Sequence, residues 1–362
     1  MVKQNKSKNL NKDISFGRVG LAQKALLAKH LSVMLKSGLT ITESLSIALD
    51  SSSGSLRKTL QGVLKSVESG QPLSSSFERY PKVFSGLFIS ATHAGESSGT
   101  LGENLEHLAE QLEKDKELVA KIKGAMLYPI VVLIAAFFLG LAMAFLVLPK
   151  ITPLFEGLKM DLPVTTRGLI WFSHFVQDYG TALFAGIVGF VIFMIWLVKQ
   201  KFIHPVTHWL FLKVPIIKKI SINANLVRFS RTLGTLLKSG LNIDEALVIT
   251  KDTVGNYYYK KALESASARI GKGTKLSDNL EQYPKLFPKM TTRMVRVGEE
   301  SGRLEETLLY LAGFYEVEVD TATKFLATAI EPILLIFIGL TVGFLALSII
   351  TPIYNITGNI RR

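Results

Sequence analysis

Three long segments without a charged residue limit what this chain can fold into. They run from Leu127 to Leu148, from Tyr179 to Val198 and from Pro332 to Ile350, and none contains Asp, Glu, Lys, Arg or His. Each is close to the roughly 20 residues that an α-helix needs to cross the hydrocarbon core of a bilayer. A buried helix of a soluble protein can be equally apolar. Three such segments in one chain instead favour an integral membrane protein with three transmembrane helices.

The charged residues are distributed unevenly around these segments. Residues 1–124 carry 17 Lys and Arg against 12 Asp and Glu, and residues 199–329 carry 20 against 13. The loop 150–178 is balanced, with three residues of each sign. Because positively charged flanks mark the cytoplasmic side, both charged regions are predicted to be cytoplasmic and the loop external. We attribute the net charge of +13 to the membrane surface, because no basic, aromatic-rich nucleic-acid motif accompanies it.

The chain also contains an internal repeat. Leu35–Leu39 recurs as Leu237–Leu241 at an offset of 202, and after one inserted residue the offset becomes 203. Residues 70–113 match residues 273–316 at 18 of 44 positions, where composition alone gives about three. The similarity continues into the apolar segments, so the repeating unit is a charged region followed by one transmembrane segment. The segment 179–198 has no copy, and we expect it to return the chain so that both repeats lie on one side of the membrane.

Each repeat is predicted to be helical. Thr40 and Glu43, like their counterparts Asn242 and Glu245, have the spacing of an N-terminal capping box. Four leucines between residues 101 and 112 are separated by four, three and four positions, which places them along one face of a helix, and the second repeat has the same stripe. No alternating pattern typical of strands is present. The predicted fold class is therefore all-α, with three transmembrane helices and two repeated cytoplasmic helical-bundle domains.

The predicted division of the chain follows from these features. The segments, in chain order, are a basic disordered N-terminal tail (1–20), cytoplasmic helical repeat 1 (21–124), transmembrane helix 1 (125–149), an external loop (150–178), transmembrane helix 2 (179–198), cytoplasmic helical repeat 2 (199–329), transmembrane helix 3 (330–351) and an external C-terminus (352–362).

Two glycine-containing motifs occupy the same place in both repeats, namely Gly95-Glu96-Ser97-Ser98-Gly99 and Gly298-Glu299-Glu300-Ser301-Gly302. The first matches the Gly-x-Ser-x-Gly pattern of serine hydrolases, which requires the serine on a strand-to-helix turn. No strand pattern precedes it, and a glutamate replaces the serine in the second copy. We therefore interpret the glycines as structural joints that end one helix and lead into the next. The glutamates Glu96 and Glu299 would then lie in a first turn or a loop, stabilised by backbone donors or a basic side chain.

Carboxylates of the same motifs are the candidates for a metal site. Glu96, Glu299 and Glu300 could help to bind a hard cation such as Ca²⁺, although no loop with ligand spacing surrounds them. His204 and His208 have the spacing of two ligands on one helical turn, but no third ligand completes the set. No catalytic or cofactor-binding residue is predicted, because the chain has no cysteine and no Walker A motif. A nucleotide used in its function would be bound by another subunit.

The third apolar segment carries the remaining candidate positions. Glu331 and Pro332 stand at its start, where a carboxylate can either have a functional partner or reach the headgroup region. The pair Gly339 and Gly343 allows close approach of two helices. We expect these segments to pack against each other or against a partner helix. They lack the polar residues that a solute pathway requires.

These features together resemble the type II secretion F family, which includes the platform proteins of type II secretion systems, type IV pili and competence pili. The resemblance rests on the repeated Leu-x-Ser-Gly-Leu, Tyr-Pro and Gly-Glu-x-Ser-Gly-x-Leu motifs, and on the linking segments 162–167 and 214–218. It covers about residues 22–355. The family implies two six-helix bundles in the cytoplasm joined to three transmembrane helices. It also implies an inner-membrane platform on which a cytoplasmic hexameric ATPase drives assembly of pilin-like subunits.

The resemblance also implies a set of partners. These are the secretion or pilus assembly ATPase, pilin or pseudopilin subunits, other inner-membrane assembly proteins, the lipid bilayer and further copies of this chain in a homo-oligomer, with no nucleic acid. Two other classes stay open on the sequence alone. A three-span membrane receptor or permease component would be favoured by intramembrane charges or a polar cavity. A hydrolase would require the serine motif to adopt its strand-to-helix turn.

Overall fold

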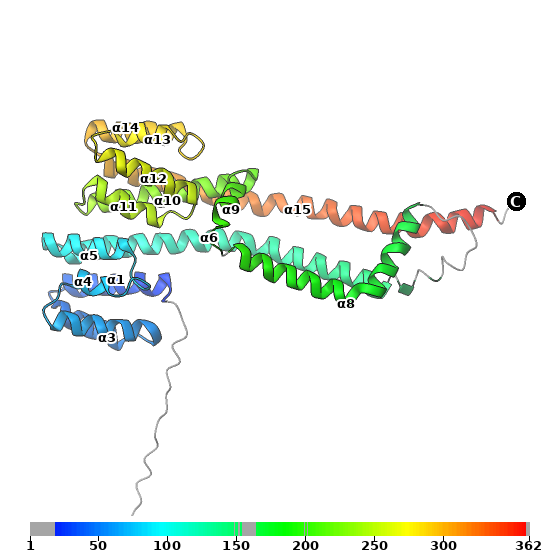
Figure 1. Ribbon diagram of the computed structural model, residues 1–362, viewed down its shortest axis with the longest axis horizontal. Coiled ribbons are helices and arrows are strands. Elements are labelled where there is room, and N and C mark those ends of the chain that lie inside the picture. The colour runs from blue at the N-terminus through cyan, green and yellow to red at the C-terminus, as the bar shows by residue number, and fades with distance from the viewer. Residues whose placement is uncertain are drawn as a thin grey trace, which may run out of the picture. The chain divides into compact units, whose positions relative to one another are not determined.

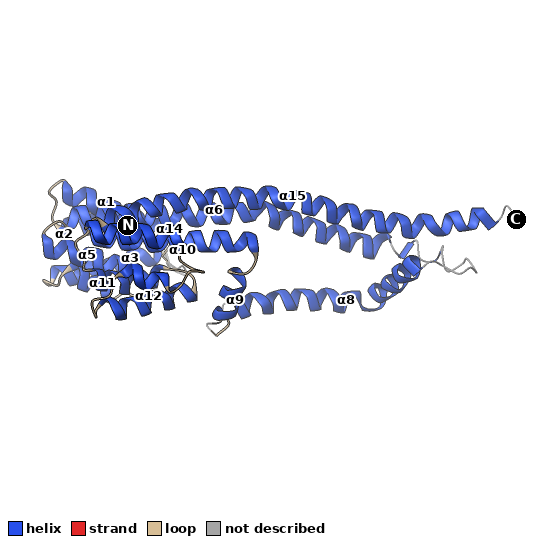
Figure 2. Ribbon diagram, turned by 90° about the horizontal axis from the view of Figure 1, so that it is seen from above, coloured by secondary structure: helices blue, strands red, loops and turns tan. Residues whose placement is uncertain are grey.

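The described part of the protein is helical throughout. The computed structural model describes residues 19–147, 149–150, 153, 164–198, 200 and 202–359. Within these residues the regular structure consists of helices, without a strand (Figure 1, Figure 2). The all-α fold class is therefore confirmed for this part of the chain. Most of the predicted N-terminal tail lies outside the described residues.

The chain divides into two compact units, each built from two separate stretches. Unit 1 contains residues up to Ala120 together with Ser221–Glu318. Unit 2 contains Lys121–Ile220 together with the residues from Val319 onward. Helices α6, α10 and α15 have residues in both units.

The two halves of unit 1 contain helices in the same order. The first half has α1 (Leu21–Lys36), α2 (Ile41–Asp50), α3 (Gly54–Glu68), α4 (Leu73–Glu78), α5 (Gly86–Ser98) and the start of α6 (Leu101–Ala142). The second half has most of α10 (Pro215–Lys238), then α11 (Ile243–Thr253), α12 (Tyr257–Ile270), α13 (Leu276–Glu281), α14 (Lys289–Ser301) and the start of α15 (Leu304–Asn359). The bounds of α4 and α5 recur in α13 and α14 at the sequence offset of 203.

Each half of unit 1 has an aromatic core. In the first half, the rings of Phe77, Phe84 and Phe88 are buried, with ring centroids 4.2–5.1 Å apart. In the second half, Phe287 packs edge-to-face against Phe229 at 5.4 Å and at 5.2 Å against Tyr259, whose buried hydroxyl donates to the carbonyl of Leu286. Tyr259 can occupy this core because its hydroxyl has an acceptor there.

The leucine stripe faces these cores as the helical spacing predicts. Leu105, Leu108 and Leu112 are buried in α6, and Leu308 and Leu311 are buried in α15. These positions fix which face of each long helix packs against its own half of unit 1.

The two predicted capping boxes differ. At the start of α2, the Thr40 hydroxyl accepts from the Glu43 amide at 3.3 Å, while the Thr40 amide donates to Glu43 at 2.9 Å. At the start of α11, Asn242 makes no side-chain cap hydrogen bond, so this second prediction is wrong. The amide side chain replaces the shorter hydroxyl there, and the acidic residues Asp244 and Glu245 in the first turn complement the helix dipole instead.

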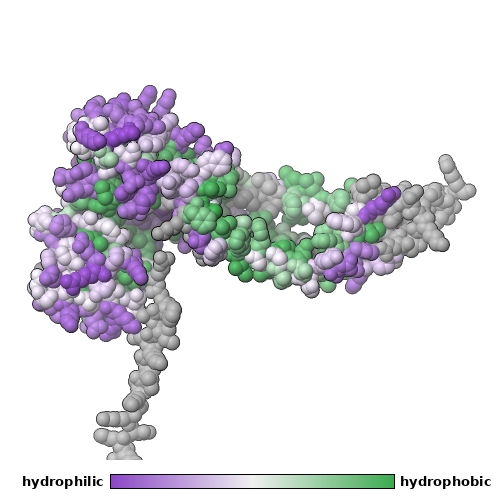
Figure 3. All heavy atoms as spheres, viewed as in Figure 1, coloured by the Kyte–Doolittle hydropathy of each residue, from purple (hydrophilic) through white to green (hydrophobic). Residues whose placement is uncertain are grey.

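Unit 2 contains the apolar helices. After α6 the chain continues as a π-helical turn, η1 (Met143–Val147), followed later by α8 (Val164–Val198) and α9 (His204–Phe211). By length and composition, two helices in the described residues can cross a membrane, one within Leu101–Ala142 and one spanning Ile170–Val198. Their apolar side chains are mostly exposed, and Figure 3 shows hydrophobic residues along this part of the chain. A shorter apolar stretch occurs at Leu335–Phe344 in α15.

Two element ends differ from the sequence prediction. Residues 164–178, expected in an external loop, are already helical as the first part of α8. Helix α15 continues to Asn359, through most of the expected C-terminal tail. Both differences have one cause: an uncharged run locates the apolar part of a helix, whereas the helix itself continues through polar residues such as Arg167 and Asp178. The middle of the expected loop, residues 154–163, lies outside the described residues.

Candidate functional site

Glu96 and Glu299 each bind the start of a neighbouring short helix. The carboxylate of Glu96, on the last turn of α5, accepts from the backbone amides of Leu73 at 2.5 Å and Ser74 at 3.1 Å. Glu299, on the last turn of α14, accepts from the amides of Leu276 at 2.5 Å and Ser277 at 3.0 Å. The first backbone amides of a helix have no acceptor within the helix, and they carry partial positive charge. A carboxylate at this position accepts their hydrogen bonds and also interacts favourably with that charge.

This arrangement corrects the position expected for the two glutamates. Neither lies in the first turn of a helix or in a loop, although backbone donors stabilise both, as expected. The neighbouring carboxylate of Glu300 forms an exposed ion pair with Lys275 at 3.1 Å. In the part of the chain that the structure describes, no three His, Asp or Glu side chains come together as a metal site. The three acidic candidates are therefore not brought together around one cation.

The glycines of the two motifs have different tasks. Gly99 and Gly302 end α5 and α14 with φ of 73° and 69°, a conformation that disfavours side chains with a Cβ. Gly95 and Gly298 instead lie inside these helices and do not end them, which corrects the prediction. A Cβ at Gly95 would lie 2.7 Å from the Cα of Leu101, so this glycine permits close contact between α5 and α6.

The serine-hydrolase alternative fails on the same geometry. Ser97 lies exposed on the surface of helix α5 and not on a turn after a strand. The backbone that would expose a nucleophile is therefore absent at this position.

A buried polar contact joins the two halves of unit 1. The side-chain amide of Gln111 in α6 donates to the Thr232 hydroxyl at 3.2 Å, and the Thr235 hydroxyl donates to Gln111 Oε1 at 3.3 Å. Both threonines belong to α10, so residues more than 120 positions apart are paired. Beside this contact, α11 of the second half lies against α5 of the first (Figure 1). Helices α5, α6, α10 and α11 thus contribute to the internal contact of unit 1.

A group of charges lies next to the internal contact. Arg231 of α10 forms an ion pair with Glu316 of α15 at 2.5 Å, and its guanidinium is almost completely buried. Burial raises the pKa of Asp115 in α6, while the nearby positive charges of Arg228 and Arg231 oppose that rise. Among the described residues, Asp115 Oδ1 and Arg231 Nη1 have no hydrogen-bond partner. Sequence analysis missed this group, although Asp115 continues the buried leucine stripe three residues beyond Leu112, which is an unusual place for an acid.

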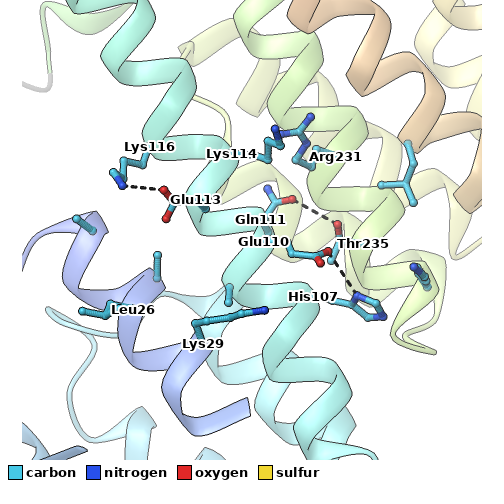
Figure 4. Close-up of a pocket in the computed structure, with 15 residues that line it drawn as sticks. Leu26, Lys29, His107, Glu110, Gln111, Glu113, Lys114, Lys116, Arg231 and Thr235 are labelled. Atoms are coloured by element: carbon cyan, nitrogen blue, oxygen red, sulfur yellow. Dashed lines mark hydrogen bonds and ion pairs between the residues drawn. The ribbon is translucent and has the colours of Figure 1, made fainter. Parts of the chain in front are cut away.

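A crevice of about 830 Å³ opens between α1, α6 and α10, with Leu309 of α15 also on its wall (Figure 4). Its basic side chains Lys29 and Lys116 are paired with Glu106 and Glu113 respectively. Lys36 and then Lys29 lower the pKa of Glu106 to about 2. The residues lining the crevice include no nucleophile paired with a base, so the arrangement suits binding and helix packing better than catalysis. Those residues are Ala22, Ala25, Leu26, Lys29, His107, Ala109, Glu110, Gln111, Glu113, Lys114, Lys116, Arg231, Thr235, Lys238 and Leu309.

Close helix approach in unit 2 occurs at a glycine that the sequence analysis did not select. A Cβ at Gly180 in α8 would overlap the ring of Phe145 in η1. At Gly339 and Gly343, a Cβ would meet no described atom within 4 Å. These two glycines therefore have no close helix neighbour among the described residues. Pro332 lies exposed within α15, and the side chain of Glu331 is outside the description.

The fold and these contacts define a helical protein with membrane-capable apolar helices, whose most specific polar groups join helices to one another. Comparison with known families agrees with this class. The family described as Type II secretion system (T2SS), protein F matches the chain twice, at residues 27–149 and 229–352. The chain belongs to this family. This membership replaces the receptor or permease interpretation.

Proteins named for type IV pilus assembly and proteins named for type II secretion are both similar to this chain over most of its length. The type IV pilus assembly protein PilC of Thermus thermophilus is 36% identical over 344 residues, which cover 94% of this chain and 84% of the relative. The type II secretion system protein F of Aeromonas hydrophila is 32% identical over 351 residues, covering 96% and 89%. The type IV pilus assembly protein PilC of Myxococcus xanthus is 33% identical over 374 residues, covering 99% and 87%. The family predicted from the repeated motifs is confirmed.

Proposed function

We propose that this chain is the inner-membrane platform of a type IV pilus or type II secretion-like machine, where it couples a cytoplasmic motor ATPase to the assembly of pilin-like subunits. The observation that carries this proposal is the double match to the family, together with relatives named for pilus assembly and for secretion. The platform would work with the motor, pilins or pseudopilins, other inner-membrane assembly proteins and further copies of itself. It would act without enzymatic activity of its own.

The proposal includes a topology of three membrane helices and two cytoplasmic repeats. The excess of positive charge in residues 1–124 and 199–329 supports it, as do the two membrane-capable helices. The third crossing is supported by the uncharged segment 332–350, which lies within the continuous helix α15. The duplicated sequence and the recurring helix bounds support two copies of one helical domain.

The topology can be tested by cysteine labelling, because the chain has no native cysteine. Gly157→Cys, in the proposed external loop, should react with an impermeant maleimide on intact cells. Ala268→Cys, at an exposed position of α12, should react only after the cells are opened. Equal labelling of both positions on intact cells would contradict the cytoplasmic placement of the second repeat.

Coupling can be tested by removing the chain from its host. Filaments or pseudopilus-dependent secretion should be lost, while the motor ATPase and unassembled pilins remain at normal levels. Supplying the wild-type chain should restore assembly. The purified chain alone should hydrolyse no ATP. Normal assembly in the deletion strain, with no second platform gene present, would refute the proposal.

A further inference from the structure

Helix α9 turns its apolar side chains outward. Val206, Trp209 and Leu210 have the spacing of neighbours on one helical face, and they are 62%, 46% and 50% exposed. The polar residues His204 and His208 lie on the opposite side and are partly buried, with their rings 5.3 Å apart. A surface helix of a soluble protein has the reverse arrangement. We call Val206, Trp209 and Leu210 the α9 face, and its exposure indicates a partner.

The position of α9 in the chain limits what that partner can be. Helix α9 begins at His204, shortly after the membrane-capable helix α8 ends at Val198, and both belong to unit 2. Phe202, in the turn between them, is 69% exposed. In both ribbon views α9 turns away from the direction of α8 (Figure 1, Figure 2). When α8 crosses a bilayer, α9 is therefore placed at its surface, where an apolar face can enter the headgroup region.

The charges around α9 have one sign. The sequence has no Asp or Glu in residues 179–243, whereas residues 199–219 contain five lysines. Lys213 and Lys218 are exposed. The Nζ atom of Lys213 lies 4.2 Å from the centroid of the Trp209 ring. Such a tryptophan is typical of the membrane–water interface, where its ring lies at the headgroup level and the long lysine side chain reaches the phosphates.

An apolar face beside lysines without acidic neighbours matches a surface that is both apolar and anionic. A bilayer with anionic phospholipids has hydrocarbon below the headgroups and negative charge at the level of the lysines. A zwitterionic bilayer would accept the apolar face but give the lysines no net charge to bind. A partner protein would have to displace the bilayer that surrounds α8 only a few residues away.

We propose that α9 lies in the plane of the membrane and selects anionic phospholipids, with the α9 face in the apolar layer and the neighbouring lysines on the headgroups. This inference rests on the proposed function only in the crossing of the membrane by α8. It does not depend on the motor or on pilins, so its test is independent of filament assembly.

Tryptophan fluorescence of the full chain in vesicles tests this directly. The chain has three tryptophans, so Trp171→Phe with Trp196→Phe leaves Trp209 alone. The vesicles contain equal parts of phosphatidylcholine and phosphatidylglycerol, and one of the two lipids carries brominated acyl chains that quench fluorescence. Quenching of Trp209 by the brominated anionic lipid should exceed quenching by the brominated zwitterionic lipid by about two-fold or more. This preference should shrink at about 1 M salt, because exposed charges are then screened.

Two variants with the same change in net charge test the assignment to α9. Lys213→Gln with Lys218→Gln should bring the two quenching values close together. Lys82→Gln with Lys285→Gln changes exposed lysines at equivalent positions of the two repeats in unit 1 and should leave the preference intact. A third chain, which keeps only Trp196 near the end of α8, reports that α8 is inserted, because both brominated lipids should quench it.

Four results would overturn the proposal. Equal quenching of Trp209 by both lipids would show that α9 does not select the anionic headgroup. Quenching of Trp196 without quenching of Trp209 would mean that the α9 face lies against protein. Equal loss of preference in the two charge variants would assign it to the net charge of the chain. No quenching of Trp196 would mean that α8 does not cross the bilayer, which removes the proposed topology as well.

Failure of the proposed function would look different. Normal filament assembly in the deletion strain would refute coupling to the motor, while the lipid preference of Trp209 would stand. Equal quenching of Trp209, with Trp196 quenched and assembly dependent on the chain, would refute the lipid selection alone.

Discussion

Removal of the Glu299 carboxylate should destabilise unit 1 far more than removal of its neighbour Glu300. Glu299 accepts from two backbone amides at the start of α13, at 2.5 and 3.0 Å, in a partly buried position. Glu300 makes one exposed ion pair with Lys275. The two substitutions, Glu299→Ala and Glu300→Ala, remove the same group from adjacent positions, so charge and composition are matched.

The expected magnitudes follow from these contacts. A hydrogen bond to a charged group contributes about 1.5–3 kcal/mol, and a buried donor left unsatisfied costs about 1–3 kcal/mol. Two amides lose their acceptor in Glu299→Ala, so with partial access to water we expect a loss of about 2–4 kcal/mol. Glu299→Gln keeps one acceptor oxygen and should lose roughly half as much. For Glu300→Ala, the exposed pair contributes about 0–1 kcal/mol.

Thermal unfolding of the purified full chain, followed by far-UV circular dichroism, measures the difference. One kcal/mol shifts the midpoint of a unit of this size by about 2–4 °C, so Glu299→Ala should lower it by about 4–16 °C and Glu300→Ala by at most about 4 °C. Hydrogen exchange at the amides of Leu276 and Ser277 should accelerate only in the Glu299 variants. Equal shifts for the two alanine variants, or unchanged exchange at these amides, would refute the capping role.

Three further outcomes follow from the same structure. Gly302→Val should lower the free energy of unfolding by about 1–3 kcal/mol, because the φ of Gly302 is positive. Gly313→Ala, at an exposed helical position with open space for a Cβ, should raise it by up to about 1 kcal/mol. Denaturant titration measures both changes in the free energy of unfolding and their opposite signs. Ser97→Ala should assemble filaments as the wild type does, and loss of assembly by a folded Ser97→Ala chain would revive the hydrolase interpretation. Burial raises the pKa of Asp115 above its ordinary value of 3.8, so the folded state holds this proton longer than the unfolded state. Stability should therefore fall as pH rises from 3.8 through the raised pKa, and Asp115→Asn should remove that fall in unfolding experiments across this range.

Local sequence patterns predicted the features that depend on neighbours along the chain. The repeat offset anticipated the recurring bounds of α4 and α13, and the leucine spacing identified Leu105 and Leu108 as buried positions. The spacing of three residues predicted the capping box at Thr40, where a threonine hydroxyl accepts from the backbone, but the same spacing at Asn242 gives no side-chain cap. The apolar runs located membrane-capable helices but not their ends, since helices continue through polar residues without a local signal.

Contacts between distant residues were not predictable in this way. The Glu96 motif suggested a structural role, but its partners Leu73 and Ser74 lie more than 20 residues away on another helix. In the sequence, Gln111 looks like an ordinary polar residue of a helix. Its partner Thr232 lies 121 residues later, so no local pattern indicates the hydrogen bond between them. Periodicity determines which face of a helix is apolar, whereas the choice of partner depends on how whole helices stack.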